Sequence, residues 1–142
     1  MGLIKVTAAD RWFSLCVRER ADWRCERCGA AHPPPSRALH CAHWHSRGSW
    51  TTRFDQANAL ALCYGCHSLT ARERDSEHRP LMIKLVGDLE LDRLAADKAR
   101  PSHGIRKRQD EISQHYRQQY AEMTRARMDG HTGRLEFEGW TP

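Results

Sequence analysis

Apolar and polar residues alternate in short patterns that predict small elements. Thr7 can cap a helix that extends to about Ala21, because its hydroxyl can accept a bond from a free N–H of the first turn. The residues expected to face the core from this part of the chain are Trp12, Leu15, Cys16 and Trp23. Three prolines within residues 30–36 exclude a helix or a central strand, so we predict a loop there.

The central part of the chain predicts strands followed by a helix. Residues 37–44 have the composition of a strand and residues 46–49 that of a turn. A second strand is expected around residues 60–62, and residues 67–77 contain no Gly or Pro and favour a helix. The expected order is turn, strand, turn, strand, turn and helix, which belongs to the α+β class.

After Pro80 the pattern changes to a short apolar segment over residues 81–86 and a short helix predicted over residues 88–98. Residues 105–127 are strong helix formers with one apolar stripe, made by Ile112, Tyr116, Tyr120 and Met123. The basic side chains beside the stripe include Lys107, Arg108 and Arg117. Two interpretations stay open, a docked helix with a solvated basic face or an arm that contacts DNA or a second copy. Residues 129–142 contain several glycines and are expected to fray.

The composition limits the size of the core. Of 142 residues, 39% are apolar, and the mean hydropathy is −0.78. A chain this polar buries little apolar surface, and such folds often depend on a metal or disulfide staple. We expect one domain over residues 1–100 and a basic helical arm and tail over residues 101–142.

Charge and targeting patterns narrow the class of protein. Lys and Arg total 23 against 18 Asp and Glu, which gives a net charge of +5 with neutral His. This balance favours a polyanionic partner, although many ordinary domains reach a similar charge. The chain has no run of 18 apolar residues and no secretory signal, so we expect no membrane partner and a cytoplasmic protein with reduced cysteines.

Two cysteine pairs have the spacing of metal-binding turns. They are Cys25 with Cys28 and Cys63 with Cys66, and 34 residues separate the pairs. Each pair places two thiolates on one tight turn, and four thiolates suit a tetrahedral zinc ion with Zn–S bonds of about 2.3 Å. Redox-active pairs and disulfides are less favoured, because no βαβ pattern surrounds the pairs and the expected compartment is reducing. We therefore expect a structural Zn²⁺ that contributes on the order of 10 kcal/mol to folding.

Residues that can act on a phosphate lie between and beside these pairs. Asn58 follows His43 after 14 residues, and His67 follows after eight more, directly behind the last cysteine. His43 and His45 alternate with Trp44, so both imidazoles are expected on one strand face. Each histidine alone could be an ordinary phosphate or core contact, but the ordered set inside a zinc frame is more specific.

In this order the chain resembles the HNH, or ββα-metal, endonucleases, whose two strands carry the first His and the Asn and whose following helix carries the last His. Further similarity to the Rap/NinG recombination endonucleases of lambda-like phages extends over residues 42–48 (AHWHSRG), residues 52–55 (TRFD), Asn58 and residues 63–67 (CYGCH). The resemblance covers about residues 22–98. It implies a small zinc-stapled ββα-metal core with an N-terminal helix and a C-terminal helical extension.

The resemblance also implies roles for single residues. His43 matches the general base that activates the attacking water, and an unperturbed imidazole pKa of about 6.5 suits that task. Asn58 matches the residue that braces the strand loop and orients the base. His67 matches a ligand of one catalytic Mg²⁺ or Mn²⁺, which neutralises the scissile phosphate and the leaving 3′ oxygen. Arg47 and Arg53 are candidate phosphate clamps, because guanidinium binds phosphate in a bidentate manner.

The chain departs from the family pattern directly before the first His. Many members carry Asp or His there as a metal ligand, whereas Ala42 has no donor atom. Either His45 or His40 supplies the missing ligand, or His43 is a ligand and His45 the base. An ion held by His67, water and DNA phosphate alone, or a loss of catalysis, also stays open.

Two classes of function follow. The first is an endonuclease that cuts branched DNA (Holliday junctions, D-loops or flaps) during phage-type recombination in the host cytoplasm. Binding two helices would most simply need a homodimer, with residues 105–127 as the candidate contact. The second is a zinc-dependent DNA-binding module without catalysis. Nicking or restriction of duplex DNA by the same unit ranks below junction cutting, because 142 residues leave little room for a recognition domain.

Overall fold

The computed structural model describes residues 4–102 and 104–142. Its helices and strands are α1 (Ala8–Arg20), β1 (Leu39–His43), β2 (Ala59–Cys63), α2 (Tyr64–Arg72), α3 (Arg79–Leu85), α4 (Asp88–Ala99) and α5 (Gln109–Met128). Short 3₁₀ turns lie at Gln56–Asn58 and Ile105–Arg108, and one π-helical turn lies at Arg74–His78. The α+β class is therefore confirmed, with helices around a two-stranded antiparallel sheet. None of the helices in the described ranges is long and apolar enough to span a membrane.

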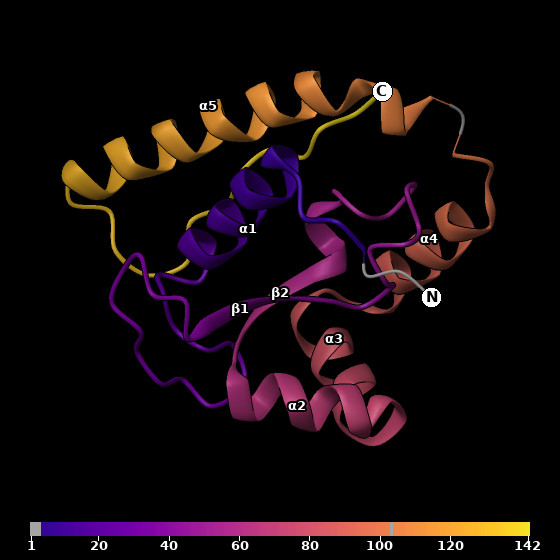
Figure 1. Cartoon of the computed structure of the whole chain (residues 1–142). Coiled ribbons are helices and arrows are strands. Elements are labelled where there is room, and N and C mark those ends of the chain that lie inside the picture. Colours follow the sequence, from indigo (N-terminus) through magenta and orange to yellow (C-terminus); the bar gives the residue numbers. More distant parts are fainter. Residues whose placement is uncertain (1–3, 103) are drawn as a thin grey trace.

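The two strands lie at the centre, between two groups of helices (Figure 1). α5 packs along α1 on one side, α2 and α3 lie on the other, and α4 lies at the edge. The strands pair antiparallel with His43 opposite Ala59, and the N–H of Trp44 donates to the carbonyl of Asn58 at 2.8 Å. Two residues of the predicted site, His43 and Asn58, therefore meet at one end of the sheet.

The capping signal at the start of α1 is confirmed. The Thr7 hydroxyl accepts a hydrogen bond from the N–H of Asp10, and the Asp10 carboxylate accepts one from the N–H of Thr7 at 2.8 Å. Of the residues predicted to face the core, Cys16 and Trp23 are buried, but the centre of the buried helix face differs from the prediction. The helix buries Ala9, Phe13, Cys16 and Val17, which recur at helical spacing. Trp12 and Leu15 are only partly buried, because they lie at the rim of this face.

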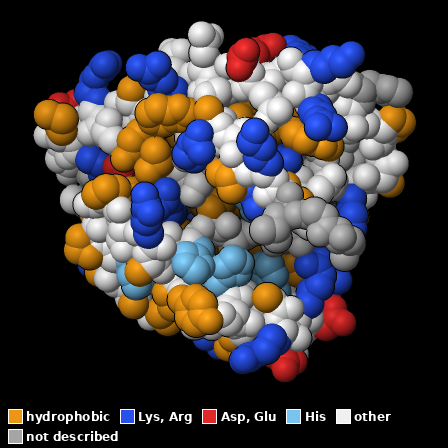
Figure 2. Space-filling view, viewed as in Figure 1, with side chains coloured by type: hydrophobic (Ala, Val, Ile, Leu, Met, Phe, Trp, Pro, Cys, Tyr) orange, Lys and Arg blue, Asp and Glu red, His pale blue; other side chains and the backbone are white. Residues whose placement is uncertain are grey.

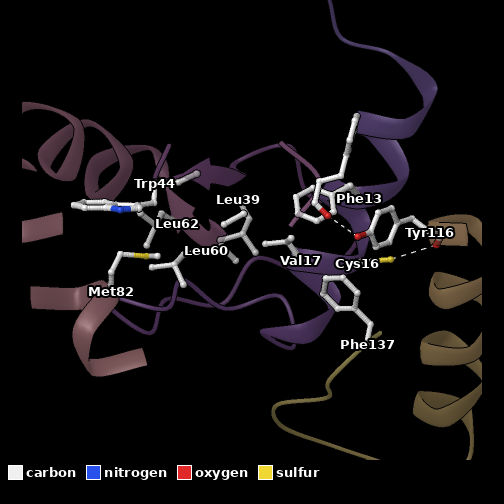
Figure 3. Packing of buried hydrophobic residues seen from close by; sticks show 14 of the residues in the cluster. Phe13, Cys16, Val17, Leu39, Trp44, Leu60, Leu62, Met82, Tyr116 and Phe137 are labelled. Carbon is white, nitrogen blue, oxygen red and sulfur yellow. Dashed lines mark hydrogen bonds between the residues drawn. The ribbon is translucent and has the colours of Figure 1, made fainter. Parts of the chain in front are cut away.

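One core connects the two groups of helices (Figure 3). On the α1–α5 side, the Phe13 ring packs edge-on against Tyr116 and Phe137, with ring centroids 5.1 and 6.3 Å apart. Through the sheet the core continues with the aliphatic residues Val17, Leu39, Leu60, Leu62 and Met82. The Phe and Tyr rings are concentrated beside α5, whereas the part towards α3 consists of aliphatic residues and the buried Trp44.

The middle of the chain follows the predicted order with shifted boundaries. β1 starts at Leu39 because residues 37–38 form a turn after the proline loop. The helix predicted over residues 67–77 begins earlier, since Cys63 takes the extended conformation of an N-cap. It ends at Arg72 and continues through the π turn into α3, which replaces the apolar segment predicted over residues 81–86.

The C-terminal part is docked rather than extended. α5 buries Ile112, Tyr116 and Met123 against α1, which favours the docked interpretation of residues 105–127. The tail expected to fray instead returns beneath α5 along α1 (Figure 1) and buries Phe137. Its backbone is held by bonds from Leu135 N to the Arg20 carbonyl (3.1 Å) and from Trp140 N to the Tyr116 hydroxyl (2.9 Å). The expected boundary near residue 100 therefore does not separate two cores.

Candidate functional site

The four predicted thiolates converge from the turn between α1 and β1 and from the junction of β2 with α2. All four Sγ atoms lie within 4.8 Å of one another, and Cys28 Sγ is 3.8 Å from Cys63 Sγ. A tetrahedral site with Zn–S bonds of about 2.3 Å separates its sulfurs by about 3.8 Å. The four cysteines, Cys25, Cys28, Cys63 and Cys66, could therefore hold a structural zinc ion. No other group of three or more His, Cys, Asp or Glu side chains converges in this way within the part of the chain that the structure describes.

Hydrogen bonds around the sulfurs prepare this site for a cation. Gly29 follows the first pair with φ of +78°, a conformation that glycine adopts without strain. Burial raises the pKa of the Cys25 thiol, but backbone N–H donors from Cys28, Cys63 and Arg27 outweigh it and lower the pKa to about 7. Burial raises the pKa of Cys66 to about 12, although the Arg27 guanidinium donates to its sulfur at 3.5 Å. Metal binding would have to displace the Cys66 proton.

Glu26 joins the first cysteine pair to the sheet and to the tail. Its N–H donates to the Ala61 carbonyl at 2.8 Å, and its carboxylate accepts from the Ala61 N–H at 2.7 Å. The other carboxylate oxygen accepts from Arg134 at 2.7 Å. The first pair is thereby fixed against the middle of β2, which leads directly into the second pair.

Asn58 braces the segment after β1. Its side chain is fully buried, and its Oδ1 accepts from the His45 N–H at 2.9 Å. Its Nδ2 donates to the carbonyls of His45 and Thr52, each at 3.0 Å. All the polar atoms of one amide thus hold two separate loop segments in place, which fixes the backbone beside His43.

His43 is held in one tautomer. Its Nε2 lies 3.0 Å from the carbonyl oxygen of Arg53, which can only accept, so Nε2 carries the proton and Nδ1 keeps a lone pair. Burial is the main cause that lowers the pKa of His43 to about 4, well below the ordinary value that the sequence suggests. The imidazole is therefore neutral at pH 7 and able to accept a proton.

His67 lies beside His40 rather than paired with His45. The Nδ1 atoms of His40 and His67 are 3.0 Å apart, a distance at which two imidazoles share either a proton or a cation. Burial, and then the charge of His40, lower the pKa of His67 and favour its neutral form. His45 is 8% exposed, and neither of its ring nitrogens has a hydrogen-bond partner in the described ranges. Ala42 offers no donor atom, and His40 and His45 are the two candidates for the missing metal ligand. The distance between His40 and His67 favours His40.

Two cavities meet at these histidines. The first, of about 580 Å³, is lined by His40, His43 and His67 and by the basic residues Arg18, Arg37 and Arg47. The second, of about 420 Å³, shares His43, Ser46 and His67 with the first, and its other polar lining residues are His45, Thr70, Arg74, His78 and Lys98. In Figure 2, histidine side chains gather along a hollow that Lys and Arg side chains surround. The site is therefore basic, and two cavities open on the same imidazoles.

Arg53 does not take the position expected of a phosphate clamp. It is 2% exposed, and its guanidinium donates to both carboxylate oxygens of Asp10 at 3.0 and 2.6 Å. The guanidinium also lies over the Trp50 ring, 4.3 Å from its centroid. The expectation for Arg53 is corrected: it is a buried structural residue. Arg47 lines the first cavity.

The basic residues predicted on the C-terminal helix lie outside both cavities. Arg108 pairs with Glu111 at 2.8 Å, and the Arg117 guanidinium lies over the Trp12 ring, 5.8 Å from its centroid. Lys107 is exposed. None of these three basic residues contributes to the lining of the two cavities.

Several lining residues were missed from the sequence: Arg18, Arg37, Arg74, His78 and Lys98. Arg18, Arg37 and Lys98 come from separate elements and loops, so no local spacing joins them to the histidines. Arg74 and His78, in contrast, follow His67 after seven and eleven positions, a helical spacing that could have placed them on the same face. His40 was considered only as one alternative ligand. The pairing of β1 with β2 and the docking of α2 bring these residues together, and single positions in the sequence carry no signal of it.

Comparisons with protein-family models, with curated proteins and with solved structures found no match for this chain. Its function is therefore argued from the site itself and from the resemblance of its motifs.

Proposed function

We propose that this chain is a metal-dependent DNA endonuclease of the HNH, or ββα-metal, type. The observation that carries the proposal is the convergence of His43, His40 and His67 in one basic cavity, with Asn58 bracing the backbone beside them. The motif order and the zinc frame support the same conclusion. A binding module without catalysis would not need His43 as a neutral imidazole in one fixed tautomer, and it would not need the adjacent imidazoles of His40 and His67.

His43 is the proposed general base. The Arg53 carbonyl keeps the proton on Nε2, so the free lone pair of Nδ1 can take a proton from an attacking water. Its lowered pKa keeps the ring neutral at pH 7, at the expense of basicity. Asn58 positions this base through the backbone and does not touch the reacting atoms.

His40 and His67 are the proposed protein ligands of a catalytic Mg²⁺ or Mn²⁺. The adjacent Nδ1 atoms fit a shared cation, although two imidazoles suit Mn²⁺ better than Mg²⁺. The ion would supply charge stabilisation at the scissile phosphate and at the leaving oxygen. Arg47, together with Arg18 and Arg37, would hold the backbone of the nucleic acid in the first cavity.

Branched DNA, as in phage-type recombination, remains the favoured substrate because of the resemblance to the Rap/NinG group. Two basic cavities on one face are compatible with a strand that bends across the site. The homodimer is not part of the proposal, because the apolar stripe of α5 expected to carry it is buried against α1.

Cleavage of a supercoiled plasmid and of a synthetic four-way junction with Mg²⁺ or Mn²⁺ tests the activity. We expect His43→Ala to lower the rate by about 10²–10⁴-fold, while the exposed His131→Ala serves as a matched control. DNA binding without cutting in either metal would favour the non-catalytic module and contradict the proposal. Faster cutting of the junction than of linear duplex is expected if branched DNA is the substrate.

A titration with Mn²⁺ tests the choice of ligands. His40→Ala and His67→Ala are expected to raise the Mn²⁺ concentration at half-maximal cleavage by about tenfold or more, since each removes a direct ligand. His45→Ala is expected to leave this concentration nearly unchanged. A rise for His45→Ala and His67→Ala, with none for His40→Ala, would assign the ion to His45 and His67 instead.

A further inference from the structure

We propose that the second cavity, bounded by His45, His78, Arg74 and Lys98, is a subsite for a backbone phosphate next to the one that is cleaved. The identity of the ligand as DNA rests on the proposed endonuclease function. The buried imidazoles and the cationic lining favour an anion in this cavity whether or not the chain cleaves DNA.

Buried polar atoms without partners line this cavity. His45 is 8% exposed and His78 is 4% exposed. Both ring nitrogens of His45 and Nε2 of His78 lack a hydrogen-bond partner in the described ranges. A buried polar atom left without a partner is unfavourable, so a ligand that accepts a hydrogen bond from the N–H group of each ring would recover part of that loss.

The charges of the lining favour an anion over a metal ion. Arg74 and Lys98 are its charged residues, and no Asp or Glu belongs to the lining. Ser46 adds a hydroxyl whose oxygen already accepts from the Gly48 N–H at 3.0 Å, which leaves its proton free for donation. Cations beside imidazoles oppose a second divalent ion but suit a phosphate.

Arg74 is held in place before any ligand binds. Its guanidinium carbon lies 3.6 Å from the centroid of the Trp44 ring, and its NH1 donates to the Trp44 carbonyl at 2.6 Å. A guanidinium has five N–H donors, so others remain for a phosphate. A donor fixed by stacking loses little entropy on binding. Lys98, which is exposed at the end of α4, can close over the same anion.

The position of the cavity explains why its ligand would be a neighbouring phosphate. It shares His43, Ser46 and His67 with the first cavity, which contains the proposed base and ligands. A strand whose scissile phosphate lies at His43 and His67 therefore continues into one cavity on each side. The second cavity would fix the register of the strand, and its residues are positioning residues rather than catalytic ones.

Scanning single neutral methylphosphonate linkages along a bound DNA tests the subsite. Binding is measured by fluorescence anisotropy with the full, zinc-loaded chain and without Mg²⁺ or Mn²⁺, so that no cutting occurs. In the wild type we expect one or two positions at which the neutral linkage weakens binding by about fivefold or more. In Lys98→Met the same linkage is expected to have a smaller effect than in the wild type, because the phosphate has already lost one of its two cationic partners while Arg74 remains.

Matched variants separate the subsite from general charge. Lys107→Met removes an exposed Lys outside both cavities and should keep the full interference pattern. Lys98 is exposed, so its substitution should not disturb folding, and His78→Gln provides a second variant from inside the cavity. Equal binding of 5′-phosphorylated and 5′-hydroxyl DNA is expected if the ligand is a backbone phosphate, and tighter binding of the phosphorylated end would overturn that assignment.

The two proposals can fail separately. A weaker interference at the same linkage in Lys98→Met, without cleavage by the wild type in any metal, would support the phosphate subsite and reject the endonuclease. Cleavage by the wild type together with an unchanged pattern in both Lys98→Met and His78→Gln would reject the subsite alone. Saturable Mn²⁺ binding that shifts the ring resonances of His45 and His78, but not those of His40, would also overturn it.

Discussion

The two sides of the central sheet are stabilised by different chemistry. On the α1–α5 side, aromatic rings fill the interior, with Phe13, Tyr116 and Phe137 in edge-on contact. On the other side, α2 buries only Cys66 and Thr70, and four sulfurs converge at its start. A metal site can therefore hold a helix such as α2, which buries few apolar side chains of its own.

The candidate catalytic residues lie between these two sides. His43 ends β1, and its ring is 5.8 Å from that of Phe13, so the aromatic side supports it. His67 follows Cys66 directly and depends on the sulfur side. The relative placement of the two imidazoles thus depends on both kinds of stabilisation, and each can be perturbed separately.

Removing the metal should have the largest effect. Cys66→Ser, or chelation of the wild type, is expected to remove on the order of 10 kcal/mol of metal-linked folding free energy. Hydrogen exchange should accelerate first in α2 and β2, while α1 and α5 keep protection longer, because the aromatic core persists there. Simultaneous loss of protection in all elements would show that the two sides form one cooperative unit. Metal content by elemental analysis provides the control.

Truncation of the central aromatic residue should have the next largest effect. Phe13 is 1% exposed, and Phe13→Ala is expected to lower the free energy of unfolding by about 3–5 kcal/mol. Leu89, which is 85% exposed, provides a matched control whose substitution by Ala should cost less than about 0.5 kcal/mol. Urea denaturation of zinc-loaded protein measures both. A small loss for Phe13→Ala would contradict the aromatic account of this side.

Acid should weaken the histidine region between the two sides. Burial lowers the pKa of both His43 and His78 to about 4. Between an unfolded value of about 6.5 and pH 4, the unfolded chain binds protons that the folded chain does not, so stability falls as the pH falls. The loss approaches about 3 kcal/mol per histidine at the acid end of this window.

Comparison with a single variant isolates this acid effect from acid release of zinc. His78→Gln lacks one of the two buried imidazoles and should lose less stability between about pH 7 and pH 5 than the wild type. Denaturation with urea in excess Zn²⁺ at both pH values measures the difference. An identical pH dependence of the two proteins would contradict a buried neutral His78.

The smallest effect is expected for one hydroxyl on the aromatic side. The Tyr116 hydroxyl donates to the Phe54 carbonyl at 2.5 Å and accepts from the Trp140 N–H at 2.9 Å. Tyr116→Phe keeps the ring but leaves the Phe54 carbonyl and the Trp140 N–H without this partner. The free energy of unfolding should fall by about 1–3 kcal/mol. Thermal denaturation measures the loss, and faster hydrogen exchange at Trp140 would locate it. No change at Trp140 would contradict the anchoring of the tail through this hydroxyl.

The sequence was most informative where chemistry repeats at short spacing. The two cysteine pairs, the Thr7 cap and the order of strands and helix were found because each is a local pattern. Arg53 was misplaced because its partner Asp10 is 43 residues away, and nothing local distinguishes a buried guanidinium from a free one.

The tail was misjudged for a related reason. Its glycines suggest fraying, but Phe137 finds a place against Phe13 and Tyr116. Of the candidate site, His43, Asn58 and His67 could be named from the sequence, whereas the second cavity could not. Helical spacing after His67 could have indicated Arg74 and His78, but long-range docking brings Lys98 to them, and a single sequence carries no record of that docking.

The return of the tail along α1 has a consequence for the order of events while the chain is being made. Residues 25–67 contain all four cysteines and both strands, so this part can capture zinc as soon as it has left the ribosome. The aromatic side must wait for Phe137, and Arg134 cannot reach Glu26 before then. The nascent protein would therefore hold its metal well before its interior closes, and the imidazoles would reach their final spacing last.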